Sequence, residues 1–309
     1  MTLRLATFNL KDFFAARPDR GVDEHAVVEA KLANVAGSLR RANADVVALQ
    51  EVGTVSHLER LVLEVRELGY GVPVVGSEDR RGIRNVILSR LPVVWSQVHQ
   101  AKTLPFPRFV DGDPDPFPAR IPLRRGIVHV RVEAGAIGEV DVLTAHFKSN
   151  LPARRKDKDG AEVPDQTPHD VGESAVRSLV QRAAEALYVR QLVDEVFAKL
   201  PDHAICVMGD LNDTVDSLPV RLVRGIDTRS KHHLRAGADL VAADRRFSVF
   251  HANTPQLIDH VLLSERLHGG LGRFEIHNEA LRYHGPHVDE PPLTEDSDHA
   301  LCVAEIDDR

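Results

Sequence analysis

The sequence predicts an α/β fold that forms a single domain. Short runs rich in β-branched residues alternate with helical patterns from one end of the chain to the other. The 309 residues are 43% hydrophobic, which is ample for a buried core, and no linker long enough to separate two domains interrupts the alternation. We therefore expect residues 1–309 to pack as one unit.

Eight apolar segments have the length and composition of β-strands. The helices are expected between them, so that strands and helices follow each other along the chain. The predicted strands are Leu3–Asn9, Asp45–Gln50, Arg84–Ser89, Ile127–Val132, Val140–Phe147, Ala204–Gly209, Ile258–Leu263 and Ala300–Ile306.

Three segments carry apolar residues at helical spacing, so each is expected to present an apolar stripe to the core. The first stripe runs from Val28 to Leu39 through Leu32 and Val35. The second helix is expected to open with a capping box, and the third and longest spans about Glu173–Leu200. The capping box is Ser56 and Glu59, and the second and third stripes are Leu61, Val62, Val65 and Leu68, and Val176, Val180, Ala183, Leu187, Val193 and Val196.

Three long segments are loops by composition: Pro105–Pro118, Leu151–Gly172 and Tyr283–Asp296. Loops of this length in a compact domain are natural places for substrate selectivity. The first holds three phenylalanines among its prolines, and we expect them to pack within the loop instead of contacting a base or a lipid. They are Phe106, Phe109 and Phe117.

The composition argues against a membrane protein and against a disulfide-stabilised one. No run of 18 apolar residues is present, and Met1 leads directly into a predicted strand, so we expect a cytoplasmic location without stable membrane association. Cys206 and Cys302 each lie inside an apolar run without a second cysteine at metal-ligand spacing. Both are expected to be small buried residues of the core.

The formal net charge of −7 lacks the basic excess of a tight, nonspecific nucleic-acid binder. A nuclease needs only a local basic surface, and basic residues gather in two places. The second group is equally well explained as solvated loop charge. The groups are Arg120, Arg124 and Arg125, and Lys148, Arg154, Arg155, Lys156 and Lys158.

Polar residues able to bind metal recur where apolar strands end. Each one alone has an ordinary explanation as a turn, a helix start or a structural histidine. Together they predict a cleft at one edge of a sheet, because strand ends meet there. They are Asn9, Glu51, His146, the pair Asp210 and Asn212, and Asp298 with His299, which precedes the last strand.

The short sequences around these residues resemble the motifs of the endonuclease/exonuclease/phosphatase family, in the family's order and over nearly the whole chain. The resemblance implies a four-layered α/β sandwich, with two mixed β-sheets face to face and helices outside. The motifs are Thr7-Phe8-Asn9-Leu10, Leu49-Gln50-Glu51-Val52, Ile87-Leu88-Ser89-Arg90-Leu91-Pro92, His146-Phe147-Lys148-Ser149, Gly209-Asp210-Leu211-Asn212-Asp213, Ile258-Asp259-His260-Val261 and Ser297-Asp298-His299.

Hydrolysis of a phosphate ester needs charge neutralisation, an activated water and a stabilised leaving oxygen. Oxygen ligands such as Glu51 and Asn9 suit Mg²⁺ or Mn²⁺. By resemblance, Glu51 is the principal metal ligand, and Asn9 and Asp298 complete or orient the metal's ligand shell.

The proton-transfer groups are expected among the remaining motif residues. His299 has a suitable ordinary pKa, and Asp259 would fix its tautomer. Asp210 would orient the attacking water or act as the base itself, so both His299 and Asp210 stay candidates for the base. His146 and Asn212 would donate hydrogen bonds to phosphate oxygens.

Three further basic or histidine-containing positions stay outside this predicted core site. Arg182, in the long helix, and Arg120 could each face phosphate or solvent. His284 and His287, near two acidic residues, could suggest a second metal, but loop histidines without ligand geometry seldom bind one.

The sequence therefore predicts a divalent-metal-dependent nuclease or phosphodiesterase acting on DNA, RNA or a small phosphodiester. The alternative within enzymes is a phosphomonoesterase or phosphodiesterase for a small or lipid-derived phosphate, which the acidic net charge favours. A binding module that lost its activity is disfavoured, because every expected catalytic position holds a competent residue. Endo or exo action, the number of metals and the oligomeric state stay open.

Overall fold

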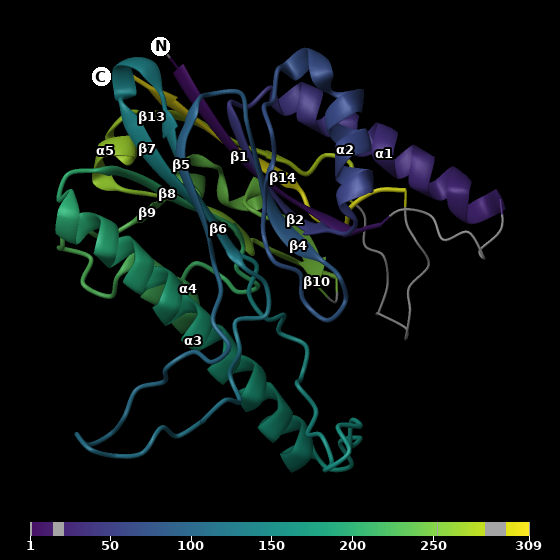
Figure 1. Ribbon diagram of the computed structural model, residues 1–309, viewed down its shortest axis with the longest axis vertical. Coiled ribbons are helices and arrows are strands. Elements are labelled where there is room, and N and C mark those ends of the chain that lie inside the picture. The colour runs from purple at the N-terminus through teal and green to yellow at the C-terminus, as the bar shows by residue number, and fades with distance from the viewer. Residues whose placement is uncertain (1, 15–21, 252, 282–294, 309) are drawn as a thin grey trace.

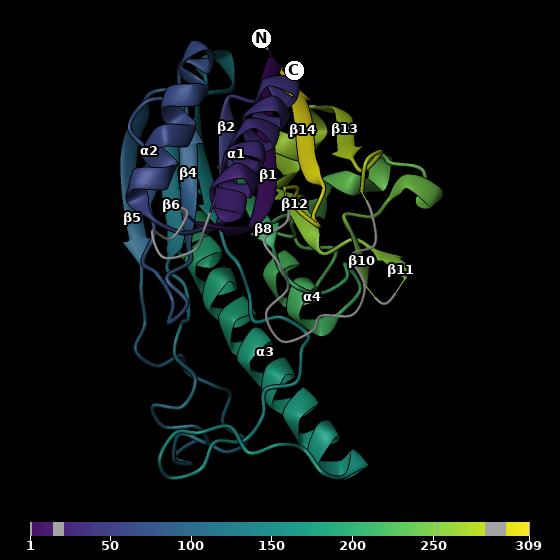
Figure 2. The ribbon, with the colours of Figure 1, turned by 90° about the vertical axis from the view of Figure 1, so that its right-hand side faces the viewer.

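A computed structural model describes residues 2–14, 22–251, 253–281 and 295–308. Two six-stranded β-sheets, here called sheet one and sheet two, pack face to face, and helices cover their outer faces (Figure 1, Figure 2). Each sheet mixes parallel and antiparallel neighbours. The predicted four-layered α/β sandwich is therefore confirmed.

Sheet one carries the first strand of the chain near its middle. Its strands, in order across the sheet, are β13 (Leu271–His277), β14 (Leu301–Asp307), β1 (Thr2–Phe13), β2 (Val46–Val52), β4 (Arg84–Ser89) and β3 (Val74–Val75). Strand β1 pairs parallel with β2 and antiparallel with β14. The N-terminal and C-terminal motifs are thus placed side by side.

Sheet two is built from the middle of the chain. Its strands, in order across the sheet, are β5 (Val93–His99), β6 (Ile127–Glu133), β7 (Glu139–Thr144), β8 (Ala204–Asp210), β12 (Asp259–Leu263) and β9 (Arg235–Ala236). Strands β10 (Val249–His251) and β11 (Thr254–Gln256) form a separate antiparallel pair.

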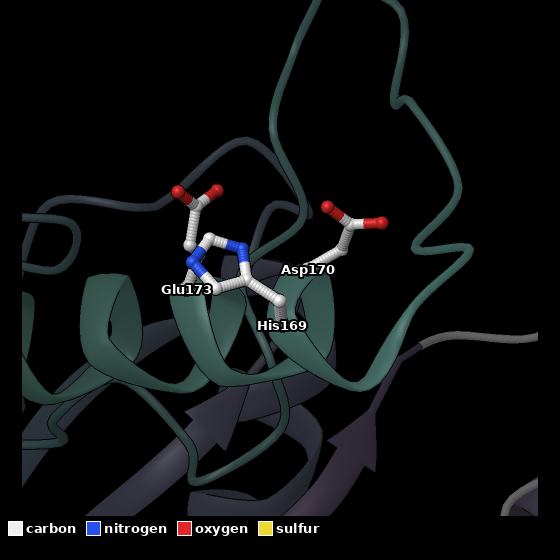
Figure 3. A group of neighbouring side chains, drawn as sticks. All are labelled: His169, Asp170 and Glu173. Carbon is white, nitrogen blue, oxygen red and sulfur yellow. The ribbon is translucent and has the colours of Figure 1, made fainter.

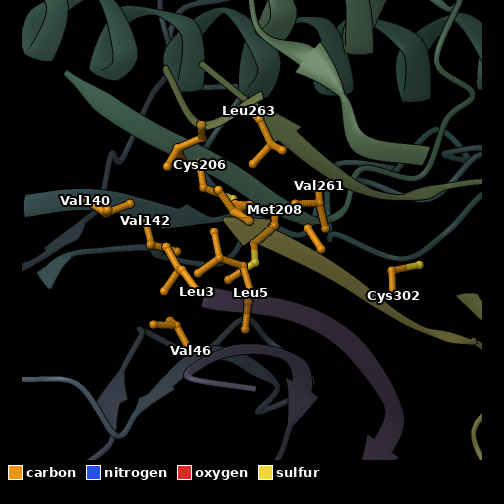
Figure 4. Close-up of a cluster of buried hydrophobic side chains, with 14 of the residues drawn as sticks. Leu3, Leu5, Val46, Val140, Val142, Cys206, Met208, Val261, Leu263 and Cys302 are labelled. Carbon is orange, nitrogen blue, oxygen red and sulfur yellow. The ribbon is translucent and has the colours of Figure 1, made fainter. Parts of the chain in front are cut away.

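The core between the sheets consists of the inward side chains of both (Figure 4). Leu5 and Val46 of sheet one face Val142 and Met208 of sheet two in one apolar cluster. Burial of such side chains contributes on the order of 1.5–3 kcal/mol each to folding. The same cluster includes both cysteines, free and buried, which confirms the prediction that they are core residues.

Helices α1 (Val22–Ala42) and α2 (Val55–Glu64) cover the outer face of sheet one. The predicted apolar stripe of α1 is buried there. The predicted capping box of α2 is wrong, because the N-cap lies two residues before Ser56. Thr54 is its N-cap and accepts a hydrogen bond from the His57 backbone N–H.

Helices α3 (Pro168–Lys199) and α4 (Leu218–Arg224) cover the outer face of sheet two, and α5 (Glu265–Gly269) follows β12. The C-terminal half of α3 packs apolar residues on the sheet, but its N-terminal half extends beyond it (Figure 1, Figure 2). The predicted stripe fails there: Val176 is 58% exposed. The residues buried in that half are polar, and they bind the backbones of two loops.

All eight predicted strands are present, with ends shifted by no more than four residues. The strands that sequence reasoning missed include β5 and β13, which are largely exposed on one or both faces and so lack a long apolar run. The short 3-10 helices are Arg66–Leu68, Gly135–Ile137, Gly237–Leu240 and Ala243–Arg245.

Where the structure describes the three predicted loops they contain no long helix or strand, except that the second ends early: α3 begins at Pro168 and not at the predicted Glu173. Phe106 and Phe117 pack edge to face within the first loop, as predicted, whereas Phe109 is 96% exposed. Most of the loop Tyr283–Asp296 lies outside the described residues, and so do His284 and His287.

Candidate active site

Two irregularities of sheet one turn polar residues out of their strands. The pairing of β1 with β2 shifts register between Asn9 and Phe13, where Lys11 and Asp12 adopt φ values of 46° and 48°. Strand β2 shifts against β4 on either side of Glu51, whose φ is 58°. Bulges of this kind re-aim side chains. Here they bring Glu51 to the Asp12 backbone, whose N–H donates to it at 2.9 Å.

In sheet two, the pairing of β8 with β12 places Asp210 directly opposite Asp259. The residue before Asp210 is Gly209, with φ of +145°, and a Cβ there would lie 2.0 Å from the Ala145 carbonyl oxygen. Only glycine permits this close approach of two backbones. The Gly-Asp sequence of the motif therefore has a steric reason.

A cleft of about 390 Å³ opens where these strand ends meet. Six of the eight predicted site residues line it, and the other two, Asn9 and Asp259, are buried behind the lining. The six are Glu51, His146, Asp210, Asn212, Asp298 and His299. The structure thus gathers every predicted site residue in one place.

His299 is hydrogen-bonded to Asp259, as predicted. Its Nδ1 lies 2.8 Å from Asp259 Oδ2, and the same oxygen accepts a 2.7 Å hydrogen bond from the Ser248 hydroxyl. Burial alone would lower the pKa of His299, but Asp259, followed by Asp210 and Asp298, raises it well above the ordinary value. The charged form of His299 is therefore favoured.

Asp210 lies at the centre of the cluster. Its Oδ2 accepts a 2.9 Å hydrogen bond from the Asn9 amide and lies 4.0 Å from His299 Nε2. Its Oδ1 accepts from the Asn212 backbone N–H at 2.9 Å. Burial, together with the charge of Asp259, raises the pKa of Asp210 to about 7. This carboxyl is thus poised to exchange a proton near neutral pH.

His146 and Asn212 complete the wall of the cleft. His146 Nε2 lies 3.4 Å from Asp210 Oδ2 and 3.8 Å from Glu51 Oε1. Burial, followed by the charge of Arg125, lowers the pKa of His146 well below its ordinary value, so the ring is neutral. The Asn212 amide donates to the Phe147 carbonyl at 3.0 Å, which leaves its second N–H available.

The side chains expected to hold a metal also fit a cation. Asp298 Oδ1 is buried without a hydrogen-bond partner among the described residues, and Oδ2 contacts the Lys11 ammonium. Burial alone would raise the pKa of Asp298, but the charges of His299 and Lys11 lower it, so the carboxylate is ionised. The orphaned oxygen and the nearby Glu51 carboxylate are hard donors, which suit Mg²⁺ or Mn²⁺.

Among the residues that the structure describes, two groups of three side chains have ligand atoms within 4.8 Å of one another: Asp210, Asp259 and His299, and His169, Asp170 and Glu173. In the cleft, Asp210, Asp259 and His299 could hold a metal ion. The other group is exposed on the first turns of α3 (Figure 3). There Asp170 accepts the Gln166 and Thr167 backbone N–H groups, and Glu173 pairs with Arg177 at 3.5 Å. Asp170 thus caps the start of α3, and Glu173 forms an ion pair along the helix.

The cleft has a basic wall that the predicted site did not include. Arg125 is only 7% exposed, and its Nε and Nη1 have no hydrogen-bond partner within the part of the chain that the structure describes. Asp79 lies 3.5 Å from Nε. Arg81, Arg124 and Lys148 line the same cleft. A buried guanidinium with free N–H groups fits a phosphate oxygen.

The remaining basic residues are outside this wall. Arg182 is buried and pairs with Asp213 at 3.2 Å, so neither of its predicted surroundings, phosphate or solvent, applies. Arg120 is exposed and does not line the cleft. In the second basic group, Lys148 lines the cleft, whereas Arg154 and Arg155 are exposed on the loop.

The family model described as "Endonuclease/Exonuclease/phosphatase family" matches residues 7–299. The chain belongs to this family. It has the family's phosphoesterase fold, with a buried aspartate and histidine cluster in the cleft. No curated protein matches the sequence significantly.

Solved structures of family proteins resemble the chain in fold. TDP2 from C. elegans is 15% identical with a TM-score of 0.59, and the match covers 99% of this chain and 75% of that one. An AP endonuclease from Archaeoglobus fulgidus is 15% identical with a TM-score of 0.56, over 99% of both chains. D. rerio TDP2 complexed with single strand DNA product is 13% identical with a TM-score of 0.58, over 99% of both. Among the described residues, no helix is long and apolar enough to cross a membrane.

Proposed function

We propose that the chain is a divalent-metal-dependent phosphodiesterase, and that its substrate is a nucleic acid. One observation carries the proposal: a single cleft joins a charged His299–Asp259 pair, an ionised Asp298 and the Arg125 guanidinium, two of whose nitrogens have no hydrogen-bond partner among the described residues. Acidic ligands, a proton-transfer group and a phosphate-binding cation are the parts that hydrolysis of a phosphate ester needs.

Glu51, Asn9 and Asp298 are the residues proposed to hold Mg²⁺ or Mn²⁺. Asp210, Asp259 and His299, whose ligand atoms lie within 4.8 Å of one another, are less suitable, because His299 Nδ1 and Asp259 Oδ2 already bind each other. A metal ion held by Glu51, Asn9 and Asp298 would neutralise phosphate charge and polarise the phosphorus centre. The protein residues supply the remaining steps.

We assign proton abstraction to Asp210 and proton donation to His299. With a pKa of about 7, a large fraction of Asp210 is ionised at neutral pH and can take a proton from the attacking water. The water oxygen bonds to phosphorus as the bond to the leaving oxygen breaks, and charged His299 can return a proton to that oxygen. His146 and Asn212 donate hydrogen bonds to phosphate oxygens.

A phosphodiester of a nucleic acid fits the cleft better than a small monoester. The basic residues Arg81, Arg124 and Lys148 spread along the lining beside Arg125, and Phe250 offers an aromatic surface for a base. The structural likeness to D. rerio TDP2 complexed with single strand DNA product supports the same substrate class.

A metal-supplemented activity panel tests this function. It compares single- and double-stranded DNA, RNA, bis-aryl phosphodiesters and aryl phosphomonoesters, with Mg²⁺ or Mn²⁺ and with a chelator. We expect polynucleotide cleavage that the chelator abolishes. Preference for a monoester, or full turnover in metal-free buffer, would contradict the proposal.

Glu51→Gln tests the metal assignment within the same panel. The substitution keeps the size of the side chain but removes charge, so activity should fall at low metal concentration and recover partly as metal is added. Glu173→Gln, in the exposed group on α3, is the matched control and should behave like the wild type. Loss without any recovery would remove Glu51 from the metal ligands.

A further inference from the structure

The bulge formed by Lys11 and Asp12, near the end of β1, contacts every residue proposed to hold the metal. The Lys11 backbone N–H donates to Asn9 Oδ1 at 2.9 Å, and the Asp12 backbone N–H donates to Glu51 Oε2 at 2.9 Å. The Lys11 ammonium pairs with Asp298 Oδ2. The position of this bulge therefore helps to set where all three ligand side chains lie.

The bulge has a backbone conformation that its residues do not favour. Lys11 and Asp12 adopt φ values of 46° and 48°, in the left-handed region where a Cβ is crowded. The pairing of β1 with β2 is interrupted between Asn9 and Phe13, so the ladder between these strands does not hold the two residues. A conformation of this kind persists only where surrounding contacts maintain it.

Helix α1 supplies one such contact through Lys31. The Lys31 ammonium donates to the backbone carbonyl of Lys11. Lys31 is only 3% exposed, and no other charged side chain of α1 is buried where the structure describes the helix. Burial of an ammonium costs free energy that its contacts must offset. Here the hydrogen bond of that ammonium is to the bulge.

Helix α2 holds the residue that follows the bulge. The ring of Phe13 is buried and packs edge to face on His57 of α2, with the ring centres 4.3 Å apart. The Phe13 carbonyl accepts the Gly53 backbone N–H at 2.9 Å. The bulge is thus fixed at its C-terminal end, and Lys31 holds its middle.

The charge of Lys31 acts against metal binding. Burial lowers the pKa of Lys31 to about 8, and the charges of Asp12 and Asp298 oppose that shift. Lys31 is therefore protonated at neutral pH, and a cation near the carboxylates repels a metal ion. Any benefit of Lys31 to the metal site must come from the position in which it holds the Lys11 carbonyl.

We propose that Lys31 is a positioning residue of the metal site, which holds the bulge so that Asn9, Glu51 and Asp298 converge on one ion. The inference rests on the proposed function, because it assumes that these three residues hold the metal. Lys31 does not line the cleft, so it acts through the bulge and touches neither metal nor substrate.

Mn²⁺ binding to the metal-free protein tests this role, measured as the loss of the electron paramagnetic resonance signal of free Mn²⁺. Lys31→Met keeps the approximate size of the side chain but removes its donor and its charge. We expect Mn²⁺ to bind at least about tenfold more weakly, the range for a lost contact behind a metal ligand. The kcat should recover as Mn²⁺ is raised, with the KM for substrate unchanged.

A second variant and two controls accompany Lys31→Met. Lys31→Gln, which is shorter and uncharged, should also weaken Mn²⁺ binding, and it takes the place of Lys31→Met if that protein does not fold. Leu32→Ala, next to Lys31 and buried in the apolar cluster under α1, should lower the melting temperature but leave Mn²⁺ affinity unchanged. Arg40→Met, exposed near the end of α1, should also leave that affinity unchanged.

Two results would overturn the role of Lys31 alone. One is a folded Lys31→Met protein that binds Mn²⁺ as tightly as the wild type, or more tightly, as expected if Lys31 acts only through its charge. The other is an equal loss of affinity in Leu32→Ala, which would reduce Lys31 to general support of the helix. A wild-type protein that binds no Mn²⁺ would overturn the metal assignment itself, and this inference with it.

Discussion

Two histidine–aspartate pairs have the same contact distance and different surroundings: His129–Asp141 lies within sheet two, whereas His299, which precedes β14 of sheet one, reaches Asp259 of sheet two. His299 Nδ1 lies 2.8 Å from Asp259, and His129 Nε2 lies 2.8 Å from Asp141. Asp259 has one further side-chain donor, the Ser248 hydroxyl, and its Oδ1 is buried without a hydrogen-bond partner in the described chain. Asp141 has two further basic partners.

The charge around each pair determines what it can do. The free nitrogen of His299 points among carboxylates in an open cleft, and its pKa is raised despite burial. Burial alone would raise the pKa of Asp141, but His129, His203 and Arg131 lower it below the ordinary value. In the first pair, His299 holds a proton that it can exchange. In the second pair, the negative charge of Asp141 is balanced by the basic side chains around it. The contact distance alone would not have distinguished them.

The largest expected effect is on turnover at the first pair. His299→Ala should lower kcat at least about a hundredfold, the range for a lost general acid or base, while the protein stays folded. Asp259→Asn should cost less, because the imidazole remains. The double variant should be scarcely slower than His299→Ala, since Asp259 acts through the histidine. Steady-state kinetics and melting temperatures measure this; losses that multiply would show independent roles.

A substitution in the second pair, His129–Asp141, should lower the stability of the fold and leave kcat unchanged. Asp141→Asn leaves buried donors around an uncharged amide, so unfolding free energy should fall by about 2 kcal/mol. Urea unfolding measures the difference. The kcat of the folded variant should match the wild type. A variant of wild-type stability with reduced kcat would reverse the roles assigned to the two pairs.

A smaller effect is the pH range over which each pair stabilises the fold. The folded-state pKa of Asp141 is lowered, so its contribution is present above the unfolded value of about 3.9 and is lost as pH falls through the folded pKa. The folded-state pKa of His299 is raised, so its contribution is complete below about 6.5 and is lost as pH rises through the folded pKa.

Urea unfolding between about pH 3 and pH 9 with chelator checks these two windows. The difference in unfolding free energy between the wild type and Asp141→Asn should become smaller only at acid pH. The difference between the wild type and His299→Ala should become smaller only at alkaline pH. If the unfolding free energy of either variant followed that of the wild type at a constant difference over this pH range, the pair would not titrate as its surroundings imply.

The sequence by itself determined the fold class, eight of the strands and the acidic, amide and histidine residues that meet at the cleft. A strand buried in a sandwich must be apolar along its length, so a polar residue at its end stands out, and seven such motifs in order identify a family. The same reasoning missed strand β5, whose side chains are mostly exposed, and misplaced the N-cap of α2 by two residues.

Only the tertiary structure decided which polar residues meet and in what charge state. The register of β8 and β12 sets Asp210 opposite Asp259, and a loop residue, Arg125, is buried with unpaired N–H groups beside them. The His129–Asp141 pair needs β6 and β7 side by side, together with His203, which follows α3. Electrostatic energies depend on distance and burial between residues far apart in the chain, and no local pattern encodes either quantity.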